Sequence, residues 1–311
     1  GEFKSKYPNT EVISYDPISS AALLIASETN FGIKAIPSYR FDEAKVIVSF
    51  NADFLGTWIS PIEYAHQYIK GRKISEVAGA KMSRHFQVES HMSLTGSNAD
   101  NRILIRPSEQ GAAIAFLYNA LASKSGGATL TSPPLNEKAA GSLAKVADQL
   151  LANKGASLVV SSSNNVAEQI IVNRINQLLE NYGKTLDITT PSYQRQGDEK
   201  ALEKLIADMD AGSIDVLIVL DNANPAYDYP GADKFVAAVS KVKSRISFAG
   251  SLNETGDLCN MIAPNHHLLE SWGDAEPKKG QLSLIQPTIA PLFNTRQAEV
   301  SLLKWADSNT V

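Results

Sequence analysis

Several short runs of consecutive apolar residues stand out along the chain, and each run is bounded by Gly, Pro, Asn, Asp or Ser. Runs of this length and setting are typical of strands that are buried inside a sheet. The predicted strands are "KVIVSF" (45–50), "RILIR" (102–106), "SLVVSS" (157–162), "IDVLIVL" (214–220), "RISFAG" (245–250) and "NMIAP" (260–264). In the fourth strand, we expect either Val216, Ile218 and Leu220 or the alternate set, Leu217 and Val219, to be buried.

Segments with apolar residues at helical spacing lie between these strands. Residues that commonly cap or end helices mark their limits. The first predicted helix starts at Pro61 with Ser60 as its N-cap, the second covers 109–122 with Ser108 as its cap, and the third carries Leu143, Val146, Leu150 and Leu151. The fourth follows Asn164 or Asn165 and ends at Gly183, and the fifth follows Asp198 and ends at Gly212. The sixth covers 232–242. Alternating strands and helices predict an α/β fold with two Rossmann-like doubly wound, mostly parallel sheets and helices on both faces.

The chain also carries an internal echo. Residues 46–54, "VIVSFNADF", align without a gap to residues 217–225, "LIVLDNANP", so that Asp53 corresponds to Asn224. A second echo pairs "DNRILIRP" (100–107) with "DLCNMIAP" (257–264). We therefore expect two α/β domains, 1–150 and 151–311, related either by duplication or by convergence on one fold.

Composition narrows the class of protein. The 311 residues suit two domains, 43% are hydrophobic, and no apolar run is long enough to span a membrane. The net charge of −4 gives the chain no excess of positive charge of the kind that nucleic-acid-binding proteins carry. Cys259 is the only cysteine, which excludes an iron–sulfur cluster held by thiolates and a Cys-rich zinc site. The opening "GEFKSKYP" is no signal sequence, and we expect the chain to be a piece of a larger protein.

The loops that follow the strands at 45–50 and 214–220 are the first candidates for a site, because ligands of open α/β sheets bind beyond the carboxyl ends of strands. In "DNANPAYDYP" (221–230), Asn222 and Asn224 are placed to offer amides to a ligand, and Pro225 stiffens the turn. The alternative is that these side chains only satisfy nearby backbone groups in Asx turns.

Other candidate motifs are weaker. His266, His267 and Glu270 share a helix face at spacings of three and four, but they supply at most three metal ligands, and hydrogen bonding is the better interpretation. "TGSNAD" (95–100) and "SGG" (125–127) match neither phosphate-binding glycine motif. Cys259 lies in an apolar stretch that favours an inert buried thiol. No catalytic residue and no metal site is predicted.

In order and spacing, the motifs resemble the catalytic subunit of molybdopterin oxidoreductases of the dimethyl sulfoxide reductase type. The resemblance covers about residues 40–306. It is carried by "VIVSFNADF", "VESHMSLTGSNADNRILIRPSEQGAA" (88–113), "DNANPAYDYP", "ETGDLCNMIAPNHHLLESWGD" (254–274) and "QPTIAPLFNTRQAEVSLLKWA" (286–306). It implies a molybdopterin guanine dinucleotide in the family and assigns vestigial cofactor-binding positions to Asn222, Asn224, Pro225, Glu254 and Thr255.

The chain departs from the family pattern at the loops that hold the cofactor. Where the family has the triplet that contacts guanine, this chain has Glu89-Ser90-His91, and the phosphate-side loop reads Pro107-Ser108-Glu109-Gln110. The first family "NP" is replaced by Asp53-Phe54, and the family's cysteine motif and metal-ligating residue are absent from this sequence. No cofactor is therefore expected in this chain.

The branch that this profile most resembles is the molybdopterin-like subunit of alternative complex III, a quinol-oxidising respiratory complex. The resemblance implies a structural domain of an electron-transfer complex that is not catalytic by itself. It also implies iron–sulfur clusters on a ferredoxin-like domain or subunit, membrane quinol-oxidising subunits as partners, and a place on the periplasmic side of the inner membrane. Two alternatives stay open: a fragment of an active molybdopterin guanine dinucleotide enzyme, and a stand-alone protein that binds a nucleotide or a small anion.

Overall fold

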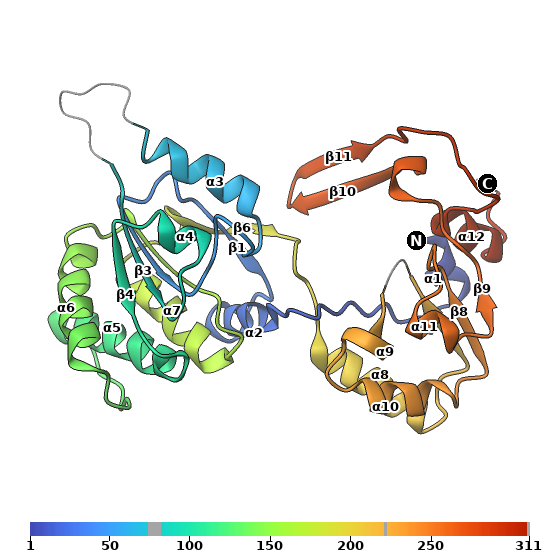
Figure 1. The fold of residues 1–311 in the computed structure, drawn as a ribbon, viewed down its shortest axis with the longest axis horizontal. Coiled ribbons are helices and arrows are strands. Elements are labelled where there is room, and N and C mark those ends of the chain that lie inside the picture. The colour runs from blue at the N-terminus through green and yellow to red at the C-terminus, as the bar shows by residue number, and fades with distance from the viewer. Residues whose placement is uncertain (74–81, 221–222, 310–311) are drawn as a thin grey trace. The chain divides into compact units, whose positions relative to one another are not determined.

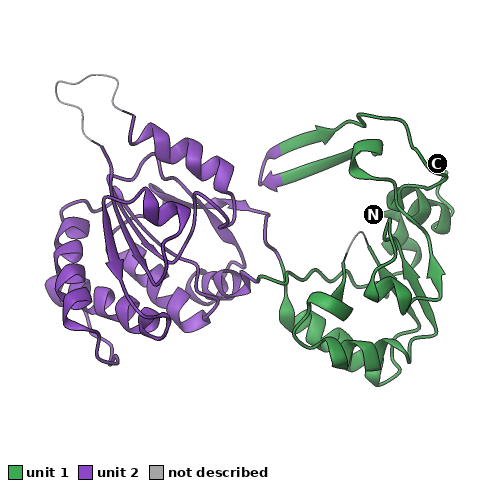
Figure 2. Cartoon of the chain, viewed as in Figure 1, with its two compact units in different colours: residues 1–18, 197–276, 282–311 green, residues 19–196, 277–281 purple. Residues whose placement is uncertain are grey.

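The structure, a computed structural model, describes residues 1–73, 82–220 and 223–309. It has an α/β fold with two parallel sheets and one antiparallel sheet (Figure 1). The chain divides into unit 1, which holds residues 1–18, 197–276 and 282–311, and unit 2, which holds residues 19–196 and 277–281 (Figure 2). Each unit has a hydrophobic core of its own.

The parallel sheet of unit 2 has the strand order β4-β3-β2-β5, which is the order of a doubly wound fold. Its strands are β2 (Val46–Phe50), β3 (Arg84–Glu89), β4 (Asn101–Leu104) and β5 (Ser157–Ser161). All five residues of β2 are buried, because this strand lies in the middle of the sheet and both of its faces are covered. The continuous apolar run in the sequence was therefore the right signal for a central strand.

Helices cover both faces of this sheet. On one face, Val46, Val48 and Phe50 pack in one core cluster with the helices that follow β4 and β5; on the other, Ile47 packs with Tyr64 and residues of α2. The helices of unit 2 are α2 (Ala21–Phe31), α3 (Pro61–Lys70), α4 (Leu94–Ser97), α5 (Gln110–Lys124), α6 (Glu137–Leu151) and α7 (Val166–Leu178), with a 3₁₀ turn over Pro107–Glu109. The alternation of side chains across a pleated strand places these two apolar sets on opposite faces.

The parallel sheet of unit 1 is smaller and has the order β7-β8-β9. Its strands are β7 (Val216–Val219), β8 (Ser244–Ser247) and β9 (Met261–Ile262). The helices of unit 1 are α1 (Glu2–Lys6), α8 (Glu199–Asp210), α9 (Pro225–Asp228), α10 (Ala232–Val239), α11 (Glu254–Asp257) and α12 (Ala298–Trp305), with a 3₁₀ turn over Leu268–Glu270. Leu217 and Val219 are buried against α8 and α10, whereas Val216 and Leu220 are exposed. Of the two predicted sets, the alternate one therefore faces the core.

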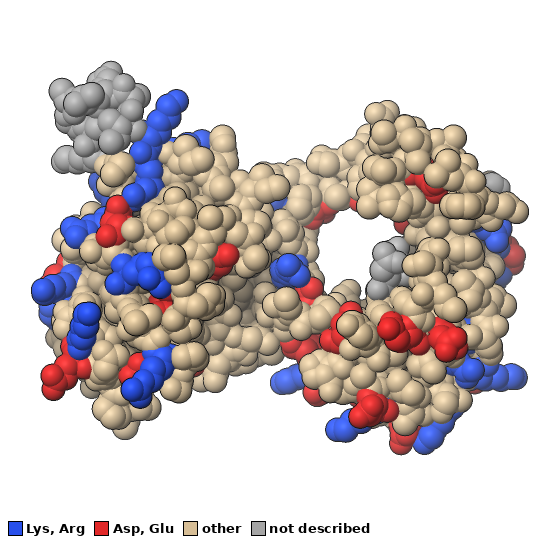
Figure 3. Space-filling model, viewed as in Figure 1, with Lys and Arg blue, Asp and Glu red and all other residues tan. Residues whose placement is uncertain are grey.

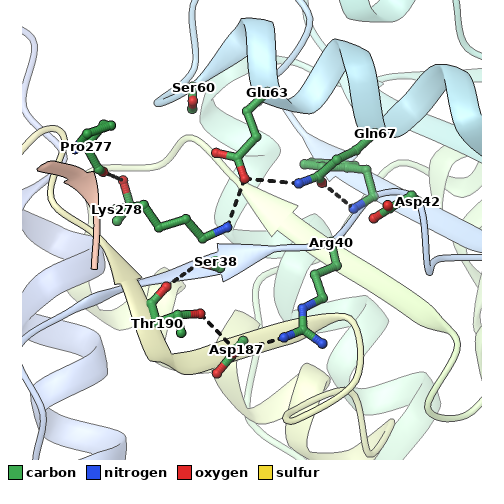
Figure 4. Close-up of polar contacts among 12 residues, drawn as sticks. Ser38, Arg40, Asp42, Ser60, Glu63, Gln67, Asp187, Thr190, Pro277 and Lys278 are labelled. Carbon is green, nitrogen blue, oxygen red and sulfur yellow. Dashed lines mark hydrogen bonds and ion pairs between the residues drawn. The ribbon is translucent and has the colours of Figure 1, made fainter. Parts of the chain in front are cut away.

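The antiparallel sheet was not predicted from the sequence. Its order is β1-β6-β10-β11, from β1 (Ile36–Tyr39), β6 (Leu186–Ser192), β10 (Gly273–Lys278) and β11 (Gln281–Ile285). β1 and β6 belong to unit 2, and residues 277–281 at the tip of the β10–β11 hairpin belong to the same unit. In unit 2, Tyr193 N–H donates to the carbonyl of Pro277 at 2.9 Å, and Lys278 Nζ forms an ion pair with Glu63 Oε1 at 2.9 Å (Figure 4).

The boundary expected near residue 150 differs from the division seen in the structure. Residue 150 lies inside α6, and β5, which follows it, pairs with β2 in one parallel sheet, so the larger unit continues to residue 196. Residues 1–18 join unit 1 through contacts such as the hydrogen bond from Asp198 N–H to the carbonyl of Ser14 at 2.9 Å. Strand pairing across distant segments thus decides the division.

The helix caps agree with the sequence in most places. Ser60 precedes Pro61 at the start of α3, Asn165 caps α7, and Asp198 caps α8. Ser108 is not a cap, because it lies inside the 3₁₀ turn and α5 starts two residues later. The helix expected to end at Gly183 ends at Leu178.

Candidate functional site

The loop after β7 brings together four of the five residues that the sequence singled out. Asn224 Oδ1 accepts hydrogen bonds from the backbone N–H of Thr255 at 3.0 Å and from its hydroxyl at 2.8 Å. Asn224 Nδ2 donates to Glu254 Oε2 at 2.7 Å, and this bond lowers the pKa of the Glu254 carboxyl. Pro225 is buried at the first turn of α9. Asn222 lies outside the described residues.

The hydrogen bonds of this loop are directed inward. Thr255 Oγ1 accepts from Ala226 N–H at 3.0 Å, and Asn224 N–H donates to the hydroxyl of Tyr15 at 3.1 Å. Tyr15 in turn donates to Asp228 Oδ1 at 2.6 Å, and burial together with this carboxylate raises the pKa of the phenol. The oxygen and the nitrogen of the Asn224 side chain both have partners within unit 1, as expected if the loop residues serve local structure.

The loop after β2 repeats this arrangement in unit 2. Asp53 Oδ1 accepts from the backbone N–H of Thr95 at 2.9 Å and from its hydroxyl at 2.7 Å, while Thr95 Oγ1 accepts from Leu55 N–H at 2.9 Å. Asp53 and Asn224 therefore make the same contacts, which agrees with the alignment of 46–54 with 217–225. We call the two arrangements the threonine locks: Asp53 with Thr95, and Asn224 with Thr255.

The two locks carry one carboxylate each, in different places. In unit 2 the carboxylate is Asp53 itself and residue 94 is Leu, whereas in unit 1 the position of Asp53 holds Asn224, which donates to the carboxylate of Glu254. An amide can donate to a neighbouring carboxylate, but an aspartate cannot, and two carboxylates at this separation would repel each other. The residue before each threonine is therefore compatible with the first residue of its lock: Leu94 with Asp53, and Glu254 with Asn224.

The second echo of the sequence is displaced by three residues in the structure. Asp100 Oδ2 accepts from His85 N–H at 2.8 Å, and Asn260 Oδ1 accepts from Arg245 N–H at 2.8 Å, so Asp100 corresponds to Asn260 rather than to Asp257. The Thr-Gly pairs at 95–96 and 255–256 fix the correct register, and they were the signal that sequence comparison passed over.

Side chains of unit 2 bond to one another at the carboxyl end of β2. β2 lies between β3 and β5, which is the point where the strand order reverses and where open α/β sheets bind ligands. Asn51, at φ 53°, accepts from Ser90 N–H at 3.4 Å, and its side-chain amide donates to Gln110. Gln110 Nε2 donates to Glu168 Oε2 at 3.3 Å, and the hydroxyl of Ser162 donates to the carbonyl of Asn51 at 2.9 Å.

The segment 89–91 begins with a buried carboxylate. The side chain of Glu89 is 1% exposed and pairs with Arg102 Nε at 2.6 Å, with a second hydrogen bond from the Ser93 hydroxyl at 2.8 Å. The backbone of Gly96 packs directly on this carboxylate, since a Cβ built there would lie 1.9 Å from Glu89 Oε1. Arg102 and Ser93 were not predicted as site residues, and no local pattern in the sequence pairs them with Glu89.

The segment 107–110 forms a closed turn. Glu109 Oε2 accepts from Arg106 N–H at 2.8 Å and from the side chain of Asn136 at 3.2 Å, and these bonds lower the pKa of the Glu109 carboxyl. Asn136 also caps α6 through Ala139 N–H at 2.9 Å. Beside this turn lies a surface pocket of about 640 Å³ whose charged lining residues include Arg106, Glu109 and Lys138.

Comparisons with known proteins agree with this architecture. No protein-family model matches the sequence. Over 85 residues, the chain is 33% identical to the menaquinone reductase, molybdopterin-binding-like subunit of Nitratidesulfovibrio vulgaris, an alignment that covers 26% of this chain and 12% of that subunit. Acetylene hydratase from Pelobacter acetylenicus superimposes with a TM-score of 0.66 at 10% identity, over 94% of this chain and 50% of that chain. The chain has a molybdopterin-binding-like oxidoreductase fold.

A second solved structure shows the same fold. The formyltransferase/hydrolase complex FhcABCD from Methylorubrum extorquens superimposes with a TM-score of 0.57 at 12% identity, over 93% of this chain and 82% of the matched chain. The chain thus spans only a small part of the curated relative and half the length of acetylene hydratase. At these identities the solved structures establish the fold, and function rests on the site.

The residues weighed for metal binding are engaged in structure. Glu270 Oε2 accepts from His267 N–H and Oε1 from Leu292 N–H, both at 3.0 Å, and these bonds lower the pKa of the carboxyl. Within the described ranges, no three His, Cys, Asp or Glu side chains gather as metal ligands. Cys259 is half-buried, burial raises the pKa of its thiol, and Sγ donates to the carbonyl of Thr255 at 3.4 Å.

The net charge of the chain is −4. On the face drawn in Figure 3, acidic and basic side chains are interspersed. Every helix in the part of the chain that the structure describes is too short or too polar to cross a bilayer.

Proposed function

We propose that the chain is part of a molybdopterin-binding-like subunit of a respiratory, quinone-linked electron-transfer complex, and that it acts there as a structural domain without a molybdenum cofactor. The name of the matched subunit, a menaquinone reductase component, supports the respiratory role. The motif order in residues 40–306 supports alternative complex III as the kind of complex. This chain alone then catalyses no reaction.

The observation that carries this proposal is the set of hydrogen bonds among side chains at the switch point of unit 2. The side chain of Gln110 is hydrogen-bonded to those of Asn51 and Glu168 there, and the hydroxyl of Ser162 donates to the backbone carbonyl of Asn51. A dinucleotide placed at this edge would have to displace these part-buried hydrogen bonds, and each bond that it breaks without replacing is unfavourable by about 0.5–1.5 kcal/mol.

The loops at 89–91 and 107–110 fit a pyrophosphate poorly for the same reason. Phosphate loops present free backbone N–H groups and a glycine that allows close approach. Here the carboxylate of Glu109 already accepts the N–H of Arg106, and the backbone of Gly96 is packed against Glu89. A carboxylate beside a phosphate also repels it, because both groups are negative. The residues present therefore do not fit molybdopterin guanine dinucleotide.

The same proposal names partners and a location. We infer that iron–sulfur clusters lie on a ferredoxin-like domain or subunit, and that the assembly includes membrane quinol-oxidising subunits on the periplasmic side of the inner membrane. The scaffold role gives a reason for the inward-directed locks at Asn224 and Asp53, because a rigid loop at each sheet edge preserves the shape of the domain.

Metal and pterin analysis of the intact subunit tests this proposal. Elemental analysis for molybdenum and tungsten is combined with fluorescence of the oxidised pterin that acid releases. We expect neither above a few hundredths of an equivalent. About one equivalent of metal and pterin would overturn the proposal and would establish the alternative, an active enzyme in which Asn224, Glu254 and Thr255 contact the cofactor.

The pocket beside Glu109 favours a second candidate function, the binding of a nucleotide or a small anion. Arg106 and Lys138 line it, and the 15-residue helix α6 starts at its edge. A thermal shift series with ATP, GTP, NAD and inorganic phosphate tests this, because a ligand at a hundred times its Kd stabilises the folded state by about 2.7 kcal/mol. A shift of several degrees that Lys138→Ala abolishes would support this function, and no shift would remove it.

A further inference from the structure

Large exposed apolar side chains are concentrated in one segment, residues 268–293, which we call the apolar arm. It contains the β10–β11 hairpin, and its exposed side chains include Trp272 at 58%, Leu282 at 74%, Leu284 at 83% and Phe293 at 77%. A surface patch of this kind on a folded domain marks an interaction site or an aggregation hazard.

The arm is ordered by bonds of its own. Thr288 N–H donates to the carbonyl of Leu269 at 2.7 Å, and Leu292 N–H donates to Glu270 Oε1 at 3.0 Å. At the tip, Lys279 N–H donates to the carbonyl of Pro191 at 3.0 Å. These bonds flank β11 (Gln281–Ile285), the strand that carries Leu282 and Leu284, and they add support to a two-stranded hairpin that is only marginally stable by itself in water.

The outer edge of β11 lacks the usual protection of an edge strand. β11 is the last strand in the sheet order and has β10 as its one strand neighbour within the described residues. Edge strands normally carry Lys, Pro or a bulge that prevents pairing with another chain. Residues 281–295 contain no charged side chain, and the surface over β10 and β11 is mostly tan in Figure 3. Leu282 and Leu284, two residues apart, point to one face of the strand.

These features select the kind of partner. A lipid surface offers no groups to pair with the unpaired N–H and C=O groups of an edge strand, so an open edge is unfavourable in hydrocarbon. An extended polypeptide supplies both hydrogen bonds and apolar side chains, which is the mode of strand addition. Additional polypeptide is present in the similar proteins, since this chain matches only 50% of acetylene hydratase and aligns with 12% of the menaquinone reductase subunit.

We propose that β11 is a docking strand, onto which an extended, uncharged and apolar strand of a partner polypeptide adds, with its side chains over Leu282 and Leu284. The partner strand completes the antiparallel sheet β1-β6-β10-β11 by a fifth strand. This proposal uses only the surface of the arm and stands whether or not the subunit binds a cofactor.

Site-specific cross-linking in the native assembly tests the proposal. A photoreactive benzoyl-phenylalanine replaces Leu284 in one variant and Ile62 in a matched control, since Ile62 is also apolar and is 87% exposed, but lies on α3. We expect the probe at 284, and not the probe at 62, to cross-link to one segment of one polypeptide of the assembly. Backbone amides in 281–285 should exchange with solvent at least tenfold more slowly in the assembly than in the isolated chain.

A charge-introducing variant measures the affinity. The double substitution Leu282→Lys and Leu284→Lys should weaken binding of the identified polypeptide about a hundredfold, because each leucine loses its apolar burial, while Ile62→Lys leaves binding unchanged. Circular dichroism and a retained melting temperature show that the variant is folded. Three results would overturn the proposal: self-association through β11 that the double variant abolishes, flotation with phosphatidylglycerol vesicles that it abolishes, or amide exchange in 281–285 that is equal with and without partner.

Discussion

The buried pair of Glu89 and Arg102 offers a direct test of how the segment 89–91 is held. The carboxylate is 1% exposed, whereas the Arg102 side chain is 33% exposed. Removing one partner of a fully buried pair destabilises a protein by about 3–5 kcal/mol, because the other charge is left buried and unpaired. Water reaches Arg102, and the hydroxyl of Ser93 still donates to Glu89 when Arg102 is removed. We therefore expect Arg102→Ala to lower the free energy of unfolding by about 2–3 kcal/mol.

A double-mutant cycle separates the pair from the rest of the site. Glu89→Gln keeps the shape and removes the charge, and it should reduce the cost of Arg102→Ala by about 1 kcal/mol or more. The unfolding free energy of unit 2 is measured by urea titration at pH 7. Trp58 is the fluorescent reporter, because it is 7% exposed and lies in unit 2. Trp272 and Trp305 are replaced by Phe in every variant, since both lie in unit 1.

An exposed ion pair provides the control. Lys124 and Asp148 also form a pair in unit 2, but their side chains are 44% and 63% exposed, so Lys124→Ala should change the unfolding free energy by less than about 0.5 kcal/mol. A cost below about 0.5 kcal/mol for Arg102→Ala, or additive effects of the two substitutions, would refute the view that this carboxylate is held by its partner rather than by solvent.

Three further predictions concern stability. Burial lowers the pKa of His85 from 6.5 to about 4, so the unfolded chain binds a proton before the folded chain does as the pH falls. The free energy of unfolding should therefore drop by up to about 3 kcal/mol between pH 7 and pH 4. In urea titrations at several pH values, His85→Gln should reduce this dependence on pH. Gly96→Ala should destabilise unit 2 by about 1–3 kcal/mol through the clash with Glu89, whereas Gly141→Ala, which meets no atom within 4 Å, should stabilise α6 by about 1 kcal/mol; the reverse order would contradict the packing. Val219→Asp should abolish cooperative unfolding of unit 1, because Val219 is 7% exposed, and cooperative unfolding of that variant by circular dichroism would show that β7 is misplaced.

The locks explain how much of the site the sequence could supply. The alignment of Asp53 with Asn224 was correct because each follows a strand that a run of apolar residues marks clearly. Their partners Thr95 and Thr255 lie 42 and 31 residues further along, in helices of four residues that have no apolar periodicity of their own. Thr255 was named only through the family resemblance, and Thr95 was not singled out, although it lies within a rejected phosphate motif and within the stretch 88–113 of the resemblance.

By itself, the sequence determined most of the segments that enter the parallel sheets, but it missed β3 (Arg84–Glu89), a strand that lies between β2 and β4 and whose residues are mostly polar. A strand covered on both faces, such as β2, is apolar at most of its positions, and such a run of consecutive apolar residues can be read directly from the sequence. Helix starts at Ser60, Asn165 and Asp198 were equally local, since a cap depends on residues within one turn.

Only the tertiary structure decided the antiparallel sheet, the division into units and the hydrogen bonds at the carboxyl end of β2. Strands β6 and β10 are polar along most of their length, so no apolar pattern in the sequence predicts them. They are strands because the backbone of distant segments completes their hydrogen bonds. The bonds among Asn51, Gln110 and Glu168 likewise join three elements far apart in the chain. A hydrogen bond between side chains from different elements has no periodic signature in sequence, because its geometry exists only once the sheet and helices have packed.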